Sequence, residues 1–467
     1  MSLKYLLHFC LLLTLVFSGC TVDRSSSAWP EPRPLGRSFD TYRPSSEPVT
    51  TRSDSPQIQE PTGVLTLRQA LSLALLNNPE LTVFSWEARA GDARSLQAGL
   101  LPNPEFEIET EEWGGTRNRK NFDGAETSIR LSQLIELAGK RGKRVRVAAL
   151  ERNVAGWDYE SKRLDVFTQT AKAFIEVLTA QNKIEVSQEM LRLATQVLET
   201  VAERVETGKV SPLEESKAKV ALATSRIEHE RSKRELKAAR KKLSAMWGSD
   251  LPLYARVEGN FESIRQIPSI ENLLSYITQN PDLARWQTEI ELREAAIELE
   301  DARGVPDFTI SAGMQRFNET NDNAFVLGFS IPFPIFNHNQ GAKLEARYGL
   351  SKALAEERAA VIKIRTDLGQ IYQELSSAYL EVTSLKNDVV PSAQLAFDAS
   401  SEGYLQGKFG YLEVLDAQRT LFQARGQYIL ALSAYHKAVA EVERLIGQRL
   451  EDTTSGNSIS EEFSDDK

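Results

Sequence analysis

Alternation of apolar and polar residues predicts four β-strands, grouped as two pairs. In the first pair the alternating apolar-side positions are Phe106, Ile108 and Thr110, followed by Thr127, Ile129 and Leu131. In the second pair they are Phe308, Ile310, Ala312 and Met314, followed by Phe325, Leu327, Phe329, Ile331 and Phe333. A period of two gives a strand one apolar and one polar face. We therefore expect two strand pairs in a sheet that is apolar on one side.

A long helical segment follows each strand pair. Five apolar residues repeat at alternating intervals of three and four, as in a coiled-coil seam: Leu164, Phe167, Ala171, Phe174 and Leu178. We expect a helix from about 137 to 206, a turn at 208–212, and a return helix to about Trp247. At 1.5 Å per residue, the first of these helices would extend ~100 Å.

The second long segment has the same plan. A helix is expected from about residue 342, with a turn at 407–410 and a return helix to about Leu445. Pro391 lies inside this helix, and proline lacks the N–H that the helical hydrogen bond requires. The sequence therefore predicts a kink at Pro391.

Three pairs of short strings indicate an internal duplication. They are Asn78-Pro79-Glu80-Leu81 with Asn280-Pro281-Asp282-Leu283, Pro104-Glu105-Phe106 with Pro306-Asp307-Phe308, and Gly208-Lys209 with Gly407-Lys408. The first two pairs share one offset, and the offset of the third is three residues shorter. A repeat of this kind indicates that one structural unit occurs twice. We expect the units at 62–260 and 261–450, each with a helix, a strand pair and a helical hairpin.

The N-terminus has the features of an export signal. Lys4 precedes an apolar run, and Ser-Gly then precedes Cys20. This arrangement resembles a bacterial lipobox, which implies a signal peptide over 1–19 and a lipid on Cys20. Thr21, in place of an aspartate, favours the outer membrane. The alternative is a simple secretory signal with an incidental cysteine. Residues 20–61 are expected to form a flexible tether, and 451–467 an acidic disordered tail.

Composition excludes several classes of function. The net charge of -9 argues against a nucleic-acid partner, which requires a basic surface. The mature histidines, His229, His338 and His436, are isolated, and no cysteine remains for a metal site after lipidation. No phosphate-binding loop, nucleophile or acid/base pair can be identified. We therefore expect no enzyme activity, no cofactor and no bound metal.

The predicted elements cannot be completed within one chain. Four strands are too few to close a barrel, which needs about eight. An open sheet would leave its edges unpaired. Three chains would contribute twelve strands and a tube of helical hairpins. The fold class we expect is therefore an α+β membrane protein, a homotrimer with a helical α-barrel and a twelve-stranded β-barrel.

This layout resembles the TolC-type outer-membrane efflux proteins from Leu65 to about Leu450. The segment Leu131–Arg141 (LSQLIELAGKR) and the segment Phe329–Gly341 (FSIPFPIFNHNQG) look like the CzcC/CusC-like heavy-metal branch, and Tyr411–Arg419 (YLEVLDAQR) looks like the wider family. The resemblance implies a trimeric passive exit duct in the outer membrane. It also implies a periplasmic membrane-fusion adaptor and an inner-membrane RND (resistance–nodulation–division) pump as partners, with heavy-metal cations as substrate.

The resemblance also suggests site residues. The adaptor would contact the two turns, at Gly208, Lys209, Val210 and Leu213 and at Gly407, Lys408, Phe409 and Leu412. The glycines could instead serve only to end helices. Asp398 would belong to an acidic ring at the pore aperture, or would be an ordinary solvated residue.

Two further groups are charged. Glu105, Glu107, Glu109 and Glu111 would face the lumen of the barrel. The basic cluster of Lys140, Arg141, Lys143, Arg144 and Arg146 would meet lipid phosphates, or form a solvated helix start.

Two other functions remain open. The chain could be an exit channel for drugs or other organic compounds, because the channel itself does not choose the substrate. It could also be a non-conducting coiled-coil scaffold lipoprotein in the periplasm. An adaptor is disfavoured, since it would have one central hairpin rather than two equal ones.

Overall fold

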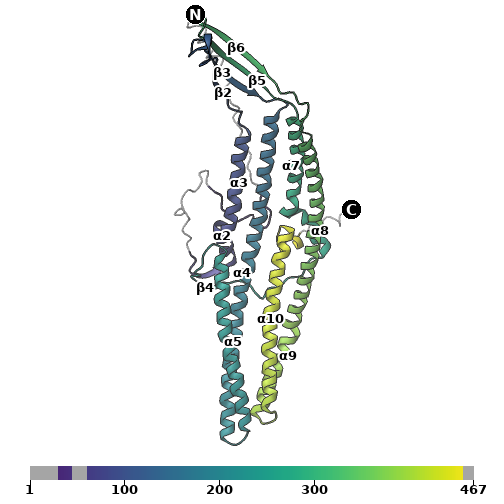
Figure 1. The fold of residues 1–467 in the computed structure, drawn as a ribbon. Coiled ribbons are helices and arrows are strands. Elements are labelled where there is room, and N and C mark those ends of the chain that lie inside the picture. The colour runs from purple at the N-terminus through teal and green to yellow at the C-terminus, as the bar shows by residue number, and fades with distance from the viewer. Residues whose placement is uncertain (1–29, 45–59, 456–467) are drawn as a thin grey trace, which may run out of the picture. The chain divides into compact units, whose positions relative to one another are not determined.

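The computed structural model describes residues 30–44 and 60–455, so Cys20 lies outside the described residues. The first half contains β1 (Gly63–Thr66), α2 (Leu67–Asn77), α3 (Pro79–Ala98), β2 (Glu105–Glu111), η2 (Arg117–Arg119), β3 (Glu126–Ile135), α4 (Lys140–Glu206) and α5 (Pro212–Ala245). The second half contains β4 (Tyr254–Glu258), α6 (Ile270–Ser275), η3 (Ile277–Gln279), α7 (Pro281–Arg303), β5 (Phe308–Phe317), β6 (Asp322–Ser330), α8 (Gln340–Ser384), η4 (Leu385–Val389), α9 (Val390–Leu405), α10 (Tyr411–Ile446) and α11 (Leu450–Ser455) (Figure 1). Helix, strand pair, long helix, turn and return helix thus follow one another twice.

The described chain divides into two compact units, and each unit takes residues from both halves. The sheet unit comprises Ala88–Gly156 and Gln287–Ala355. The hairpin unit comprises Glu31–Glu87, Trp157–Trp286 and the described chain from Glu356 onward. The compact units therefore differ from the two predicted repeats, because α3, α4, α7 and α8 contribute residues to both units.

The sheet unit contains the four predicted strands in a single antiparallel sheet. Their order is β2-β3-β5-β6, so β2 and β6 are the edges. The apolar face predicted by the alternation is exposed: Phe325 is 77% and Leu327 82% accessible, with Phe106, Ile108, Ile129, Leu131, Ile310, Met314 and Phe329 on the same face. The alternation therefore indicates the two faces of the sheet correctly, although no core formed by the described residues covers the apolar one.

Strand β6 is shorter than the sequence predicts. It ends at Ser330, whereas Ile331 and Phe333 were expected to continue the strand. Pro332 and Pro334 have no N–H to donate to a neighbouring strand. Because β5 pairs with β6 only as far as Thr309 opposite Ser330, this continuation lacks a partner in the described chain.

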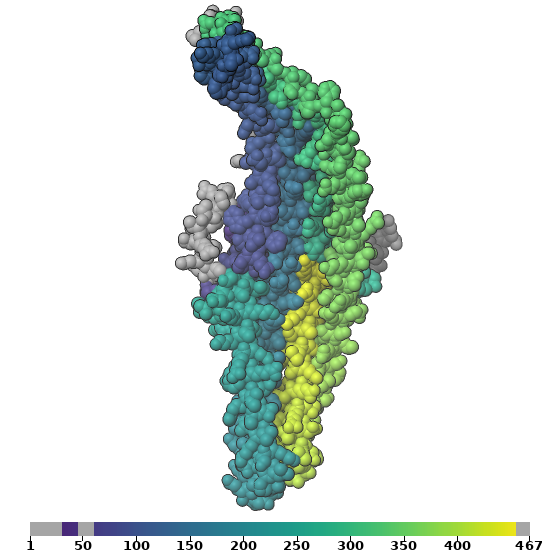
Figure 2. Space-filling model, viewed as in Figure 1, coloured from purple at the N-terminus to yellow at the C-terminus, as the bar shows by residue number. Residues whose placement is uncertain are grey.

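The hairpin unit contains the two predicted helical hairpins. Helix α4 turns into α5, whose N-cap Ser211 accepts a hydrogen bond from Leu213 N–H. In the second hairpin, α9 and α10 lie side by side (Figures 1 and 2) and share a core of Phe397, Tyr404, Tyr411 and Val414. At Pro391, where the sequence predicts a kink, the chain forms the π-helical turn η4 just before the proline. Such a turn widens the backbone where a proline ring would crowd a helical carbonyl.

The predicted seam along α4 is buried. Leu164, Phe167, Ala171, Phe174 and Leu178 are all less than 9% accessible. The last two belong to the main core, with Trp247, Tyr254 and residues of α8 and α10. The seam therefore has the role that its spacing predicts. None of the helices between residues 60 and 455 is both long and apolar enough to cross a membrane.

A second, two-stranded sheet was not predicted. Strands β1 and β4 pair in parallel, with Leu65 opposite Val257. Both residues are buried in the main core. Each strand has only four or five residues, which is too short for a pattern with a period of two to be recognised.

Residues 30–44, which lie within the predicted tether, have no helix or strand but are packed against the hairpin unit. Leu35 is fully buried, and its N–H donates to the Gly447 carbonyl at 2.9 Å. Arg163 donates to the Leu35 carbonyl at 2.9 Å, and the Phe39 ring meets Phe167 edge to face. Single apolar anchors of this kind leave no periodic signal in a sequence.

Arg163 also forms a buried ion pair with Glu160 at 2.7 Å, with side chains 2% and 3% accessible. Removing one partner of a buried pair leaves an uncompensated charge, which costs about 3–5 kcal/mol. We expect Arg163→Met to lower the free energy of unfolding by this amount in denaturant titrations followed by circular dichroism. Arg231→Met is the control, because Arg231 is 68% accessible where it pairs with Glu235. Equal losses in the two variants would contradict this account.

Candidate functional sites: two helical turns and one strand face

The first helical turn ends α4 in a Schellman motif. Gly208 has φ +69°, in the left-handed region that favours glycine. Its N–H donates to the Val205 carbonyl at 2.9 Å, and the N–H of Lys209 donates to the Arg204 carbonyl at 2.9 Å. These two bonds satisfy carbonyls that a helix end otherwise leaves unpaired.

The second turn repeats this geometry. Gly407 has φ +73°, and its N–H donates to the Tyr404 carbonyl at 3.0 Å. The N–H of Lys408 donates to the Gly403 carbonyl at 2.8 Å. The Phe409 ring covers Gly403 and leaves no space for a side chain there. The glycines do end the helices, so this local role is established for both turns.

The tips also present apolar side chains to solvent. Leu213 is 60%, Leu412 57% and Phe409 49% accessible. Lys209 and Lys408 are exposed beside them, and Val210 is half-buried. Each tip therefore combines an exposed leucine with an exposed lysine, a surface that another apolar helix with acidic neighbours could contact.

The two tips are bound to each other by residues that the sequence did not single out. The Arg204 guanidinium lies 4.3 Å from the centre of the Tyr404 ring and donates to the Tyr404 carbonyl. The Tyr404 hydroxyl lies 3.5 Å from a Glu214 carboxylate oxygen. Burial, and then the charge of Glu214, raise the pKa of Tyr404. The sequence carried one signal that could have identified these residues: Arg204 and Tyr404 each lie shortly before the glycine of one of the two duplicated turns.

Asp398 lies on the exposed side of α9. Its carboxylate accepts a hydrogen bond from Gln394 at 2.9 Å, and Gln394 accepts one from Arg425 at 2.7 Å. An exposed carboxylate in this position fits both an aperture ring and a solvated surface residue, so its role stays a prediction.

The four glutamates of β2 share one face of the sheet, as the alternation predicts. Arg130 of β3 lies on the same face, 4.0 Å from Glu107 and 3.6 Å from Glu109. The face is therefore acidic with one basic residue inside it. Ser128, Ser132 and Gln315 add further polar groups to it.

Most of the basic cluster is engaged within the sheet unit, and its contact with lipid phosphates or with solvent alone stays a prediction. Lys140 is buried, and its ammonium lies 2.7 Å from Asp307. Arg144 pairs with Glu136, and Arg146 pairs with Glu298 at 3.2 Å. Lys143 donates to the Glu298 carbonyl at 3.1 Å. Asp307 and Glu298 lie far from the cluster in sequence, so local spacing could not identify them; only Glu136 is a neighbour along the chain.

Two of the three histidines have structural roles. His229 Nδ1 lies 3.1 Å from the Ser187 hydroxyl, and His436 donates its Nε2–H to the Phe261 carbonyl at 2.8 Å. Desolvation lowers the pKa of His436. Within residues 30–44 and 60–455, no three His, Cys, Asp or Glu side chains are grouped as a metal site would require.

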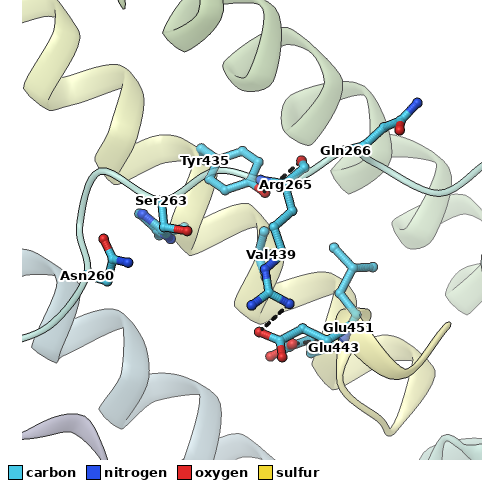
Figure 3. Close-up of a pocket in the computed structure, with 10 residues that line it drawn as sticks. Asn260, Ser263, Arg265, Gln266, Tyr435, Val439, Glu443 and Glu451 are labelled. Carbon is cyan, nitrogen blue, oxygen red and sulfur yellow. Dashed lines mark hydrogen bonds and ion pairs between the residues drawn. The ribbon is translucent and has the colours of Figure 1, made fainter. Parts of the chain in front are cut away.

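A cavity of about 250 Å³ lies in the hairpin unit, between the 260–266 segment and α10 (Figure 3). Tyr435, His436, Glu443 and Glu451 line it, and Arg265 pairs with Glu451 at 2.9 Å. Burial raises the pKa of Glu443 to about 7, although the Leu450 N–H donates to its carboxylate at 2.9 Å. The Tyr435 hydroxyl donates to the Arg265 carbonyl at 3.1 Å, so the polar groups of the cavity mainly bind the backbone around them.

Comparison with known proteins gives the class of this chain. A family model described as outer membrane efflux protein matches residues 70–249 and 274–448. The chain therefore belongs to the outer membrane efflux protein family, whose members are channel proteins and not enzymes.

Individual members of this family and one solved structure are similar to most of the chain. The chain is 35% identical over 390 residues to the cobalt-zinc-cadmium resistance protein CzcC of Cupriavidus metallidurans, covering 84% of this chain and 92% of that protein. It is 26% identical to the nickel and cobalt resistance protein CnrC of the same bacterium, covering 64% and 68%. The crystal structure of the channel protein CusC has a TM-score of 0.65 at 19% identity, covering 88% of this chain and 99% of that chain. The fold and the family are thus those that the sequence resembles.

Proposed function

We propose that three copies of this chain form an outer-membrane channel that exports heavy-metal cations. The observation that supports this most directly is the four-stranded sheet, whose apolar face is exposed along its width and whose two edges have no partner strand among the described residues of one chain. Three such sheets would close a twelve-stranded barrel with the apolar face toward lipid. The helical hairpins of three chains would then form the tunnel in the periplasm, and the internal duplication would give it near-sixfold regularity.

The polar face of the sheet would line the exit. The glutamates of β2 would face the lumen, where water solvates them and where they attract cations. Arg130 reduces this attraction near Glu107 and Glu109, so the wall would be a hydrated acidic surface rather than a binding site.

Attachment and assembly complete the proposal. A lipid on Cys20 would anchor the N-terminus in the outer membrane, through burial of its acyl chains. The two helical tips would contact a periplasmic adaptor, and the adaptor would connect the channel to an inner-membrane RND pump. The exposed Leu213, Leu412 and Phe409 support contact at the tips, because apolar side chains at a tip gain from burial against a partner.

The substrate is tested by deleting the gene in its own host. We propose metal cations because CzcC and CnrC are named as metal resistance proteins. The deletion should lower tolerance to zinc, cobalt and cadmium several-fold and raise their accumulation, with recovery on complementation. A loss of tolerance to organic compounds alone would instead support the organic-compound channel. If purified protein conducts no ions in a lipid bilayer, the chain is a scaffold.

Adaptor contact is tested at Gly407. A leucine in this left-handed conformation costs about 1–2 kcal/mol, so Gly407→Leu should reshape the tip and lower metal tolerance in the complemented strain. Gly407→Asn is the matched control, because asparagine tolerates this conformation better. Trimers should remain on native gels for both variants. Full tolerance with Gly407→Leu would count against adaptor contact at this tip.

The aperture is tested at Asp398 in planar bilayers. Three carboxylates in a ring would favour cations, so Asp398→Asn should shift the reversal potential in a salt gradient toward that of an unselective pore. Asp388→Asn removes another exposed carboxylate ten residues earlier and should leave the potential nearly unchanged. Identical behaviour of the two variants would assign Asp398 to the solvated surface.

A further inference from the structure

The two edges of the sheet have backbone groups that no neighbouring described strand pairs. β2 is one edge, and β6 with the segment after it is the other. In that segment Phe333 is 83%, Ile335 73% and Phe336 88% accessible. The Ile335 N–H donates only locally, to the Phe333 carbonyl at 2.9 Å. Exposed strand edges of this kind pair readily with another chain.

The internal duplication matches each edge strand with an inner strand of the other repeat. Ile108 lies opposite Ile129 in the first strand pair, and Ile310 lies opposite Phe329 in the second. β2 therefore corresponds to β5, and β3 corresponds to β6. The following helices keep this relation, because Lys143 N–H donates to Gly139 and Lys343 N–H donates to Asn339, both at 3.1 Å.

The corresponding seam inside the chain joins β3 to β5. Leu131 lies opposite Ala312, Gln133 opposite Ile310, and Ile135 opposite Phe308. Replacing each residue of this seam by its counterpart in the other repeat gives a seam between β6 of one copy and β2 of another.

We propose that residues 330–335 of one copy pair antiparallel with β2 of a second copy, in the register of the β3–β5 seam. Ser330 then lies opposite Glu111, Ile331 opposite Thr110, Phe333 opposite Ile108, and Ile335 opposite Phe106. The proposal rests on the proposed trimer and deepens it by specifying which residues join the copies.

The side chains fit this register. Phe333 and Ile335 meet Ile108 and Phe106 on the apolar face, while Pro332 and Pro334 lie opposite Glu109 and Glu107 on the polar face. A slip of one residue would place Phe333 opposite a glutamate and reverse every side chain of the segment. Cross-strand apolar pairs stabilise a sheet, so the register that forms them has the lower free energy.

The prolines are compatible with the seam. Alternate residues of a strand direct their N–H groups to the same side, so Pro332 and Pro334 remove donors from one side only. β5 offers no paired residue beyond Thr309, so one side of this segment has no strand partner within the part of the chain that the structure describes. With the missing donors on that side, Ile331 and Phe333 keep their N–H groups for β2 of the second copy, and Ile335 would exchange its local bond to Phe333 for one to this strand.

The test is disulfide cross-linking of the full-length protein in membranes. Glu111→Cys with Ser330→Cys places two cysteines directly opposite each other on the polar face, and Thr110→Cys with Ile331→Cys does so on the apolar face. Opposite residues lie within the Cα separation that a disulfide allows. Within one chain these edges are three strand spacings apart, roughly 14 Å, so any disulfide must join two chains. Oxidation should convert most monomer into dimers and trimers on non-reducing gels.

Three controls define the outcome. Glu107→Cys with Ser330→Cys lies on the same face but four residues out of register, and should stay monomeric. Leu131→Cys with Ala312→Cys is the equivalent pair inside the chain, and should form a disulfide without changing the mass. Each single-cysteine variant gives the background from native cysteines.

The results separate this seam from the proposed function. Cross-links in the out-of-register pair, or in neither test pair while trimers persist on native gels, overturn the seam and leave the channel proposal intact. Absence of any trimer overturns both.

Discussion

An apolar sheet face in contact with water is costly, and the sheet of this chain has one along its full width. Each square ångström of apolar surface removed from water contributes about 25 cal/mol, so side chains as exposed as Phe325 and Leu327 leave a large stabilisation unused. The edge strands also leave backbone N–H and C=O groups without a partner strand in the described chain. Lipid on the face and neighbouring copies at the edges would satisfy both, which is why the channel proposal follows from the sheet more than from any single residue.

The two helical turns show how one local solution can be used twice. Both glycines adopt the left-handed conformation, and both turns form the same pair of backbone hydrogen bonds. The side chains around them differ, and Arg204 and Tyr404 then join the two tips. A tip held in this way would present its exposed leucines and lysines in a fixed arrangement, which favours contact with a partner because less freedom is lost on binding.

Much of this arrangement can be predicted from the sequence, because strands and long helices have strong periodic signals. The alternation identifies all four strands and their apolar face, and the three–four spacing from Leu164 to Leu178 identifies the buried seam. The short strands β1 and β4 escape detection, since a few residues carry no recognisable period. The anchoring of residues 30–44 by Leu35 and Phe39 escapes detection for the same reason.

The partners of the charged groups could not be predicted from the residues next to them in the sequence. Lys140 belongs to a basic run whose composition predicts a surface position, yet its side chain is buried against Asp307. Asp307 is brought close to Lys140 only by the pairing of β3 with β5. Sequence by itself determined the four strands of the large sheet, the long helices and the two turns, because each depends on neighbours along the chain. Tertiary structure decided which charges are paired, where β6 ends and which residues tie the tips together, because each of these depends on contacts between segments far apart in the chain.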